Sequence, residues 1–181
     1  MIEEFKINFD TNKLKKIAKA WAKNPWVKVG ILEDKDDKRK KATWNKKKNS
    51  YSLKKTDEGK SNTEIAFAHE FGSRGRYGNL PERSFLRMPI RDDFQKVWNQ
   101  YAKTPNAAED FVNNPKKFLN MVGELAVQVV DDAFQNGGSS QHKWPALKDS
   151  TLAKKKVNQI LVETGQLRDS ISYEIVNEGD K

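Results

Sequence analysis

The residues that could carry hydrolytic chemistry are few in this sequence. Ser139 and Ser140 precede His142 in a polar loop, which is weak support for a triad because a triad is a spatial arrangement. Asp131 and Asp132 are adjacent on an expected helix and point in different directions, so they make a poor acid–base pair. GxSxG, HExxH and Walker motifs are absent. We therefore expect no catalytic residues and no enzyme activity.

Metal and phosphate sites are equally poorly supported. His69 and His142 are the only histidines and the chain has no cysteine, so no ligand cluster is visible, and we expect a structural hydrogen-bonding role for His69. The loop 73–79 is rich in glycine and carries Arg74 and Arg76, but it lacks the Gly-Lys-Ser/Thr element and the preceding strand of a phosphate-binding loop. The sequence predicts neither a metal nor a bound cofactor.

A basic segment, 34–60, is the most unusual stretch of the chain. It holds ten lysines and one arginine against five acidic residues, which supplies +6 of the net charge of +9. It shows no usable periodicity and almost no aliphatic residues, so we predict a long mobile arm. Basic residues interleaved with aromatic ones can grip phosphates and stack on bases, and can equally anchor a loop on a neighbouring subunit. A solvated arm that orders only in an assembly is favoured over base stacking.

Seven residues are candidates for contacts with DNA or with another subunit: Trp44, Lys46, Lys47, Lys48, Tyr51, Arg74 and Arg76.

The composition fits a single domain, 1–181, with one modest core. Hydrophobic residues make up 36% of the chain and charged residues 33%. No apolar run reaches the length of a bilayer span, and the N-terminus has no signal-peptide pattern, so we expect no membrane. The absence of cysteine excludes disulfides and fits a cytosolic product. The basic balance favours a polyanionic partner such as nucleic acid.

The element that must organise this chain is a long helix between Asn114 and Gly137. Asn114 can cap it, Pro115 suits its first position, and Gly137 can end it in the left-handed conformation. Gly123, in the middle of the helix, suggests close packing. Lys117 is expected on the solvent side. Apolar residues recur at helical spacing: Phe118, Leu119, Val122, Leu125, Ala126, Val129, Val130, Ala133 and Phe134.

Shorter elements surround this helix in the predicted α+β fold, in which a mixed or antiparallel sheet packs on the central helix. Residues 104–113 are expected to be a linker. Strands are predicted at 5–9, 26–32 and 171–175. Helices are predicted after Asp10, at 63–71 behind a Ser61/Glu64 capping box, from about 89 to 101, after Asp149 and at 166–170.

Three groups of segments together resemble the virion-morphogenesis, or tail-completion, family of tailed bacteriophages. Their order and spacing carry the resemblance, which covers most of the chain except the basic segment and 104–113. The first group is 27–31 (VKVGI) with 64–72 (EIAFAHEFG). The second is 80–87 (LPERSFLR). The third is 144–147 (WPAL) with 150–155 (STLAKK) and 161–171 (LVETGQLRDSI).

The resemblance implies a subunit of the phage neck or tail end that assembles between the head and the tail. We expect a homo-oligomeric ring, a hexamer, that contacts neighbouring neck, connector and tail proteins. Genomic DNA would pass through it non-specifically. The protein would be assembled in the host cytoplasm and located in the virion.

Two hypotheses from different classes follow. The first is the structural ring, whose energy comes from protein–protein burial. The alternative is a free basic nucleic-acid-binding protein that uses the 34–60 arm and gains its energy from counterion release.

Overall fold

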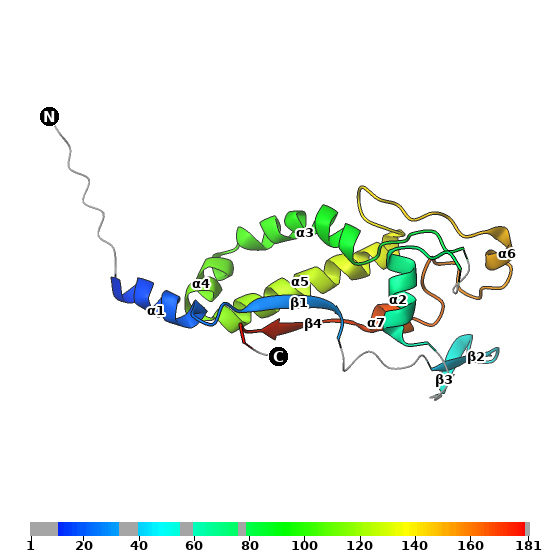
Figure 1. Ribbon diagram of the computed structural model, residues 1–181, viewed down its shortest axis with the longest axis horizontal. Coiled ribbons are helices and arrows are strands. Elements are labelled where there is room, and N and C mark those ends of the chain that lie inside the picture. Colours follow the sequence, from blue (N-terminus) through cyan, green and yellow to red (C-terminus); the bar gives the residue numbers. More distant parts are fainter. Residues whose placement is uncertain (1–10, 33–39, 55–59, 76–78, 180–181) are drawn as a thin grey trace.

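The computed structural model of the chain describes residues 11–32, 40–54, 60–75 and 79–179. These residues form an α+β fold, as predicted, in which both two-stranded sheets are antiparallel (Figure 1). In chain order the elements are α1 (Thr11–Trp21), β1 (Trp26–Ile31), β2 (Lys41–Asn45), β3 (Ser50–Lys54), α2 (Asn62–Glu70), α3 (Arg87–Ala102), α4 (Pro105–Asn113), α5 (Pro115–Asn136), α6 (Asp149–Leu152), α7 (Gln166–Asp169) and β4 (Ile171–Val176).

Helix α5 is the central helix that the sequence predicts. Pro115 occupies its first position and Gly137 ends it with a left-handed φ of 67°. The predicted cap is wrong, because Asn114 makes no side-chain hydrogen bond to the helix start. Six of the nine predicted stripe residues are buried, and so is Gly123, whereas Phe118, Val122 and Leu125 are half-buried. The six are Leu119, Ala126, Val129, Val130, Ala133 and Phe134.

Two layers cover α5. Strands β1 and β4 pair in register from Trp26↔Val176 to Ile31↔Ile171 and pack on one side of the helix, while α3 and α4 pack on another (Figure 1). Gly123 faces Tyr173 of β4 so closely that a β-carbon at residue 123 would lie 2.2 Å from the Tyr173 ring. A glycine is therefore required where the sheet crosses the helix, as its position in the sequence suggests.

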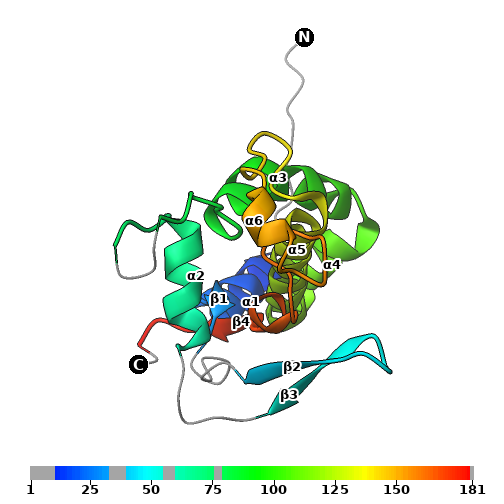
Figure 2. The same ribbon diagram turned by 90° about the vertical axis from the view of Figure 1, so that its right-hand side faces the viewer.

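The basic segment differs from its prediction. Residues 41–54 are not an irregular arm but a β-hairpin, β2–β3, which lies to one side of the helical body (Figure 2). The register pairs Ala42 with Leu53 and Trp44 with Tyr51. Because side chains alternate across a strand, these four residues share one face and leave the lysines and serines on the other. This two-residue period is present in the sequence, but the number of lysines obscures it.

The predicted linker before α5 is also wrong, because residues 105–113 form α4. Pro105 begins this helix, and Ala107 and Asp110 are buried against the rest of the protein. Lys117 is on the solvent side as expected, yet its Nζ lies 3.0 Å from the buried carboxylate of Asp110. The predicted strand 5–9 and the predicted Asp10 cap lie outside the described residues.

Candidate functional site

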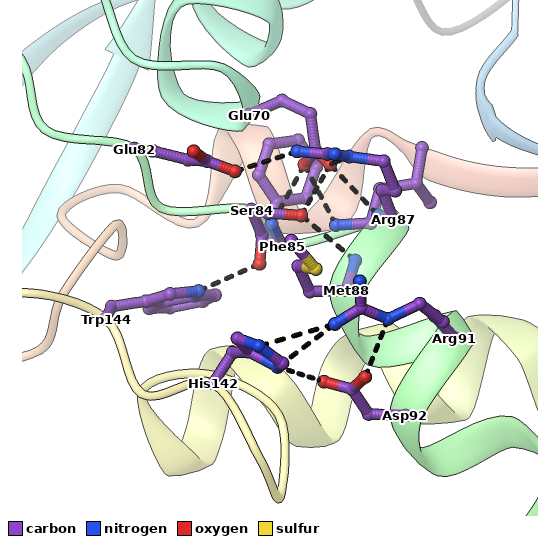
Figure 3. Close-up of polar contacts among 11 residues, drawn as sticks. Glu70, Glu82, Ser84, Phe85, Arg87, Met88, Arg91, Asp92, His142 and Trp144 are labelled. Carbon is purple, nitrogen blue, oxygen red and sulfur yellow. Dashed lines mark hydrogen bonds and ion pairs between the residues drawn. The ribbon is translucent and has the colours of Figure 1, made fainter.

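The carboxylate of Glu70, at the end of α2, caps the start of α3 (Figure 3). Its Oε2 accepts the backbone N–H groups of Phe85 and Leu86 at 2.9 and 3.1 Å. Its Oε1 accepts the backbone N–H of Arg87 at 3.0 Å and the hydroxyl of Ser84 at 2.6 Å. The first N–H groups of a helix have no partner within the helix, and leucine at the N-cap position cannot supply one. Glu70, from another helix, therefore accepts the N–H of Arg87, and the hydroxyl of Ser84 accepts the N–H of Met88 at 3.0 Å.

The segment between α2 and α3 is also joined to the loop after α5. The indole Nε1 of Trp144 donates to the carbonyl of Ser84 at 2.9 Å. Arg83 donates from Nε and Nη2 to the carbonyls of Pro145 and Ala146, at 3.0 and 3.1 Å. Burial lowers the pKa of the Arg83 guanidinium from its ordinary value. These buried donors and acceptors satisfy one another, so the contacts fix the loop in place.

Five of the six segments that carry the resemblance to the phage family meet in one place, whereas 150–155 is largely exposed. Residues 64–72, 80–87 and 144–147 are connected by the hydrogen bonds of Glu70 and Trp144. Segments 27–31 and 161–171 reach the same core through apolar side chains: Ile31, Leu167 and Ile171 pack with Phe85, Phe134 and Trp144. We call this contact region the motif junction.

A second polar cluster contains Ser139 and His142, which both contact Asp92 of α3. Figure 3 shows His142 beside Asp92 and Arg91. Ser139 Oγ donates to Asp92 Oδ2 at 2.5 Å, and the Nδ1 of His142 lies 2.6 Å from the same oxygen. The backbone N–H of His142 donates to Ser139 Oγ at 2.9 Å. A nucleophilic serine must instead give its proton to the imidazole. The geometry gives the hydroxyl proton to the acid, so it does not activate Ser139.

This second cluster fastens the loop after α5 onto α3. The hydrogen bond from Ser139 is the largest influence that lowers the pKa of Asp92, to about 2, with smaller contributions from His142 and Arg91 against the opposing effect of burial. Arg91 Nε lies 2.9 Å from the other carboxylate oxygen of Asp92. The backbone N–H of Ser140 donates to Asp93, one residue further along α3. Two adjacent acids of α3 therefore hold one loop.

The other candidate acids behave as the sequence predicts. Asp131 lines a groove beside Arg168, with 3.5 Å between carboxylate and guanidinium, whereas Asp132 lines a different groove beside Lys96. Their side chains point apart. His69 contributes its backbone carbonyl, which accepts the N–H of Arg83 at 2.8 Å. Within the described ranges, no group of three or more acidic or histidine side chains could hold a metal ion.

The hairpin brings together five of the seven candidate contact residues. The rings of Trp44 and Tyr51 lie 4.9 Å apart, centroid to centroid, and the Tyr51 hydroxyl donates to Glu163. That hydrogen bond raises the pKa of Tyr51 to about 12. The side chains of Lys46, Lys47 and Lys48 are exposed at the turn. The aromatic side chains thus contact each other and the chain's own body, and only the lysines remain open to a partner.

Arg74 and Arg76 do not join this group in the described structure. Arg74 lines an open hollow beside Phe71 and Lys148, on the loop after α2. Arg76 lies outside the described residues. Among the described helices, none combines the length and apolar character that crossing a bilayer requires.

Sequence reasoning missed the three acids that organise these contacts, Glu70, Asp92 and Glu163. For Glu70 a signal was present, because an acid at the end of a helix is unfavourable next to the helix dipole. Asp92 and Glu163 gave no local signal, because their partners lie 47 and 112 residues away.

Comparison of the chain with protein-family models, with curated proteins and with solved structures found no match.

Proposed function

We propose that this chain is a structural virion protein of the neck or tail end of a tailed bacteriophage. Copies of it form a homo-oligomeric ring, a hexamer, around the DNA channel and join the head side to the tail. The ring contacts neighbouring neck, connector and tail proteins, and DNA passes through it without sequence-specific contacts. The protein is assembled in the host cytoplasm and ends in the virion.

The motif junction is the observation that carries this proposal. Segments from opposite halves of the chain carry the resemblance to the phage family through their order and spacing. In the structure they share a physical task, because Glu70 and Trp144 bond them into one junction. Side chains committed to buried hydrogen bonds are what a scaffold requires, whereas a catalytic site needs groups that remain open to substrate.

Exposed apolar side chains agree with a subunit that is covered in an assembly. Phe67 and Phe71 of α2 are 65% and 53% exposed, and their rings lie 4.9 Å apart. Trp26 at the start of β1 is 55% exposed. Large neighbouring aromatic side chains in water mark protein-contact surfaces more often than isolated ones do. Burying them between copies would supply energy that salt does not screen.

A free nucleic-acid-binding protein is the second candidate. The exposed Lys46, Lys47 and Lys48 at the hairpin turn favour it. This function needs no ring, and its affinity would fall steeply as salt rises.

Mass photometry of the purified protein across a salt series separates the two. The ring hypothesis expects particles of six times the chain mass that persist in high salt, with annular shapes in negative-stain images. A chain that stays monomeric at every concentration and salt, yet binds DNA, contradicts the ring and supports the alternative.

A further inference from the structure

Two segments of the chain carry almost all of its net charge. The hairpin segment 40–54 contains six lysines and no acidic residue, and the segment 148–163 contains four lysines and two acidic residues, so the two together carry +8 of the total +9. Figure 1 places the hairpin and α6 toward the same end of the long axis, and Figure 2 looks at that end. Two stretches separated by nearly a hundred residues thus form one basic end.

A single carboxylate joins these two segments. Glu163 Oε1 accepts the hydroxyl of Tyr51 and, at 3.2 Å, the backbone N–H of Lys156. Glu163 Oε2 lies 3.3 Å from the Nζ of Lys155. Hydrogen bonds from Tyr51, Lys156 and Lys155 lower the pKa of Glu163 against the opposing effect of burial, so the group is ionised at neutral pH. The hairpin is therefore held beside the second lysine segment.

Gln166 fixes the base of the hairpin. Its Oε1 accepts the backbone N–H of Lys40 at 2.7 Å, and its Nε2 donates to the carbonyl of the same residue at 3.2 Å. This double contact imitates the pairing of one strand with another. With Glu163 and Gln166 together, the hairpin has two attachment points on the body.

Most lysines of this end are available to a ligand. The side chains are exposed, and within the part of the chain that the structure describes the ion pairs do not include them. They are Lys41, Lys46, Lys47, Lys48 and Lys54 of the hairpin and Lys148, Lys154 and Lys156 of the second segment.

We propose that these two segments form one binding surface for the phosphate backbone of duplex DNA, and that the Tyr51–Glu163 contact positions the hairpin lysines beside Lys154 and Lys156. The inference rests on the proposed function and adds to it the second half of the surface and its positioning residues. The rings of Trp44 and Tyr51 are half-buried and meet edge to face, and the Tyr51 hydroxyl is bonded to Glu163, so they are poorly placed to stack on unpaired bases. Binding comes from charge, and the duplex has the higher density of phosphates.

The experiment is a salt series of fluorescence anisotropy with a mixed-sequence DNA duplex and, separately, one of its single strands. We expect the duplex to bind more tightly than the single strand. The triple variant Lys46→Ala, Lys47→Ala, Lys48→Ala should reduce the slope of log affinity against log salt by about 3, and Lys154→Ala with Lys156→Ala by about 2, because each lysine removed leaves one phosphate with its counterion.

Charge-matched and charge-neutral variants test the geometry. Lys15→Ala with Lys16→Ala removes the same charge from exposed positions of α1 and should leave the slope unchanged. Tyr51→Phe removes only a hydroxyl and should weaken duplex binding, whereas Tyr173→Phe should not. Any of four results would overturn the inference. Two concern the salt slope, which would fall equally in the α1 and Lys154/Lys156 variants or would not fall in the Lys154/Lys156 variant. The other two are an unchanged duplex affinity in Tyr51→Phe and a preference of the protein for the single strand.

Mass photometry of the same samples in high salt keeps the two proposals apart. If rings form but their affinity for duplex DNA is unchanged in the lysine variants, the proposed neck function is retained and the basic surface is refuted. If the protein is monomeric and binds duplex DNA through both lysine segments, the basic surface is retained and the proposed ring is refuted.

Discussion

Replacing Glu70 with glutamine changes one buried oxygen of the carboxylate into an amide NH₂. If the NH₂ takes the position of Oε2, the backbone N–H groups of Phe85 and Leu86 both lose their acceptor. If it takes the position of Oε1, the N–H of Arg87 loses its acceptor, while the Ser84 hydroxyl can turn to accept. Either orientation leaves at least one donor of the α3 start facing another donor.

The expected cost follows from the number of donors left without a partner. A buried N–H group that loses its acceptor costs roughly 1–3 kcal/mol, and the charge of the carboxylate strengthens the bonds that it makes in the wild type. With one or two such groups, Glu70→Gln should lower the free energy of unfolding by about 2–4 kcal/mol. That is a large part of the stability of an ordinary domain.

Glu82→Gln is the matched control. Glu82 also reaches Arg87, at 2.7 Å, but this ion pair is about half exposed, so its loss should cost less than about 1 kcal/mol. Urea denaturation followed by tryptophan fluorescence measures the stability of both variants, because Trp144 is buried in the motif junction. Hydrogen exchange should accelerate at Leu86 and Arg87 in Glu70→Gln alone. Equal, small losses in both variants would refute Glu70 as the cap of α3.

Two further predictions concern other buried acids. Because the pKa of Asp92 is held at about 2, chiefly by Ser139, the ionised group stabilises the fold above the unfolded-state pKa near 4 and this contribution is lost as pH falls through about 2. The stability difference between wild type and Asp92→Asn, from urea titrations, should therefore shrink by about 2 kcal/mol between about pH 5 and pH 2, and a constant difference would contradict the pairing. Lys117→Asp should lower the thermal midpoint more than Lys116→Asp, because it turns the ion pair with Asp110 into a contact between like charges. Matching midpoints would show that the Asp110 contact is not formed.

The sequence predicted the elements whose signals are local. Helix α5 has its proline, its apolar stripe and its terminal glycine within one stretch, and α2 has its capping box in four residues, where Ser61 Oγ accepts the N–H of Glu64 at 3.1 Å. The strand after α7 is an alternating run. Each of these depends on neighbours along the chain, so a pattern of apolar and polar residues is sufficient to find it.

What failed was the interpretation of polar stretches. The lysines around Trp44 and Tyr51 suggested disorder, although the alternation that forms the hairpin was present. The prediction of residues 104–113 as a linker failed because Asp110, a polar residue, is buried in α4. Its burial is understood only from the structure, where it pairs with Lys117 of the following helix. The contacts of the motif junction could not be predicted from the sequence for a different reason. Ser84 and Trp144 are 60 residues apart, and hydrogen bonds at that distance leave no periodic trace.

The pairing of β1 with β4 also sets the time at which this protein can fold on the ribosome. The sheet joins residues 26–31 to residues 171–176, from Trp26↔Val176 to Ile31↔Ile171. A nascent chain that has completed α5 still lacks β4, so Tyr173 cannot yet cover the side of α5 at Gly123. Contacts so distant along the chain form slowly and late. A nascent chain therefore cannot complete this sheet until Val176 has emerged from the ribosome, so β1 remains without its partner strand for most of the synthesis of the intervening residues.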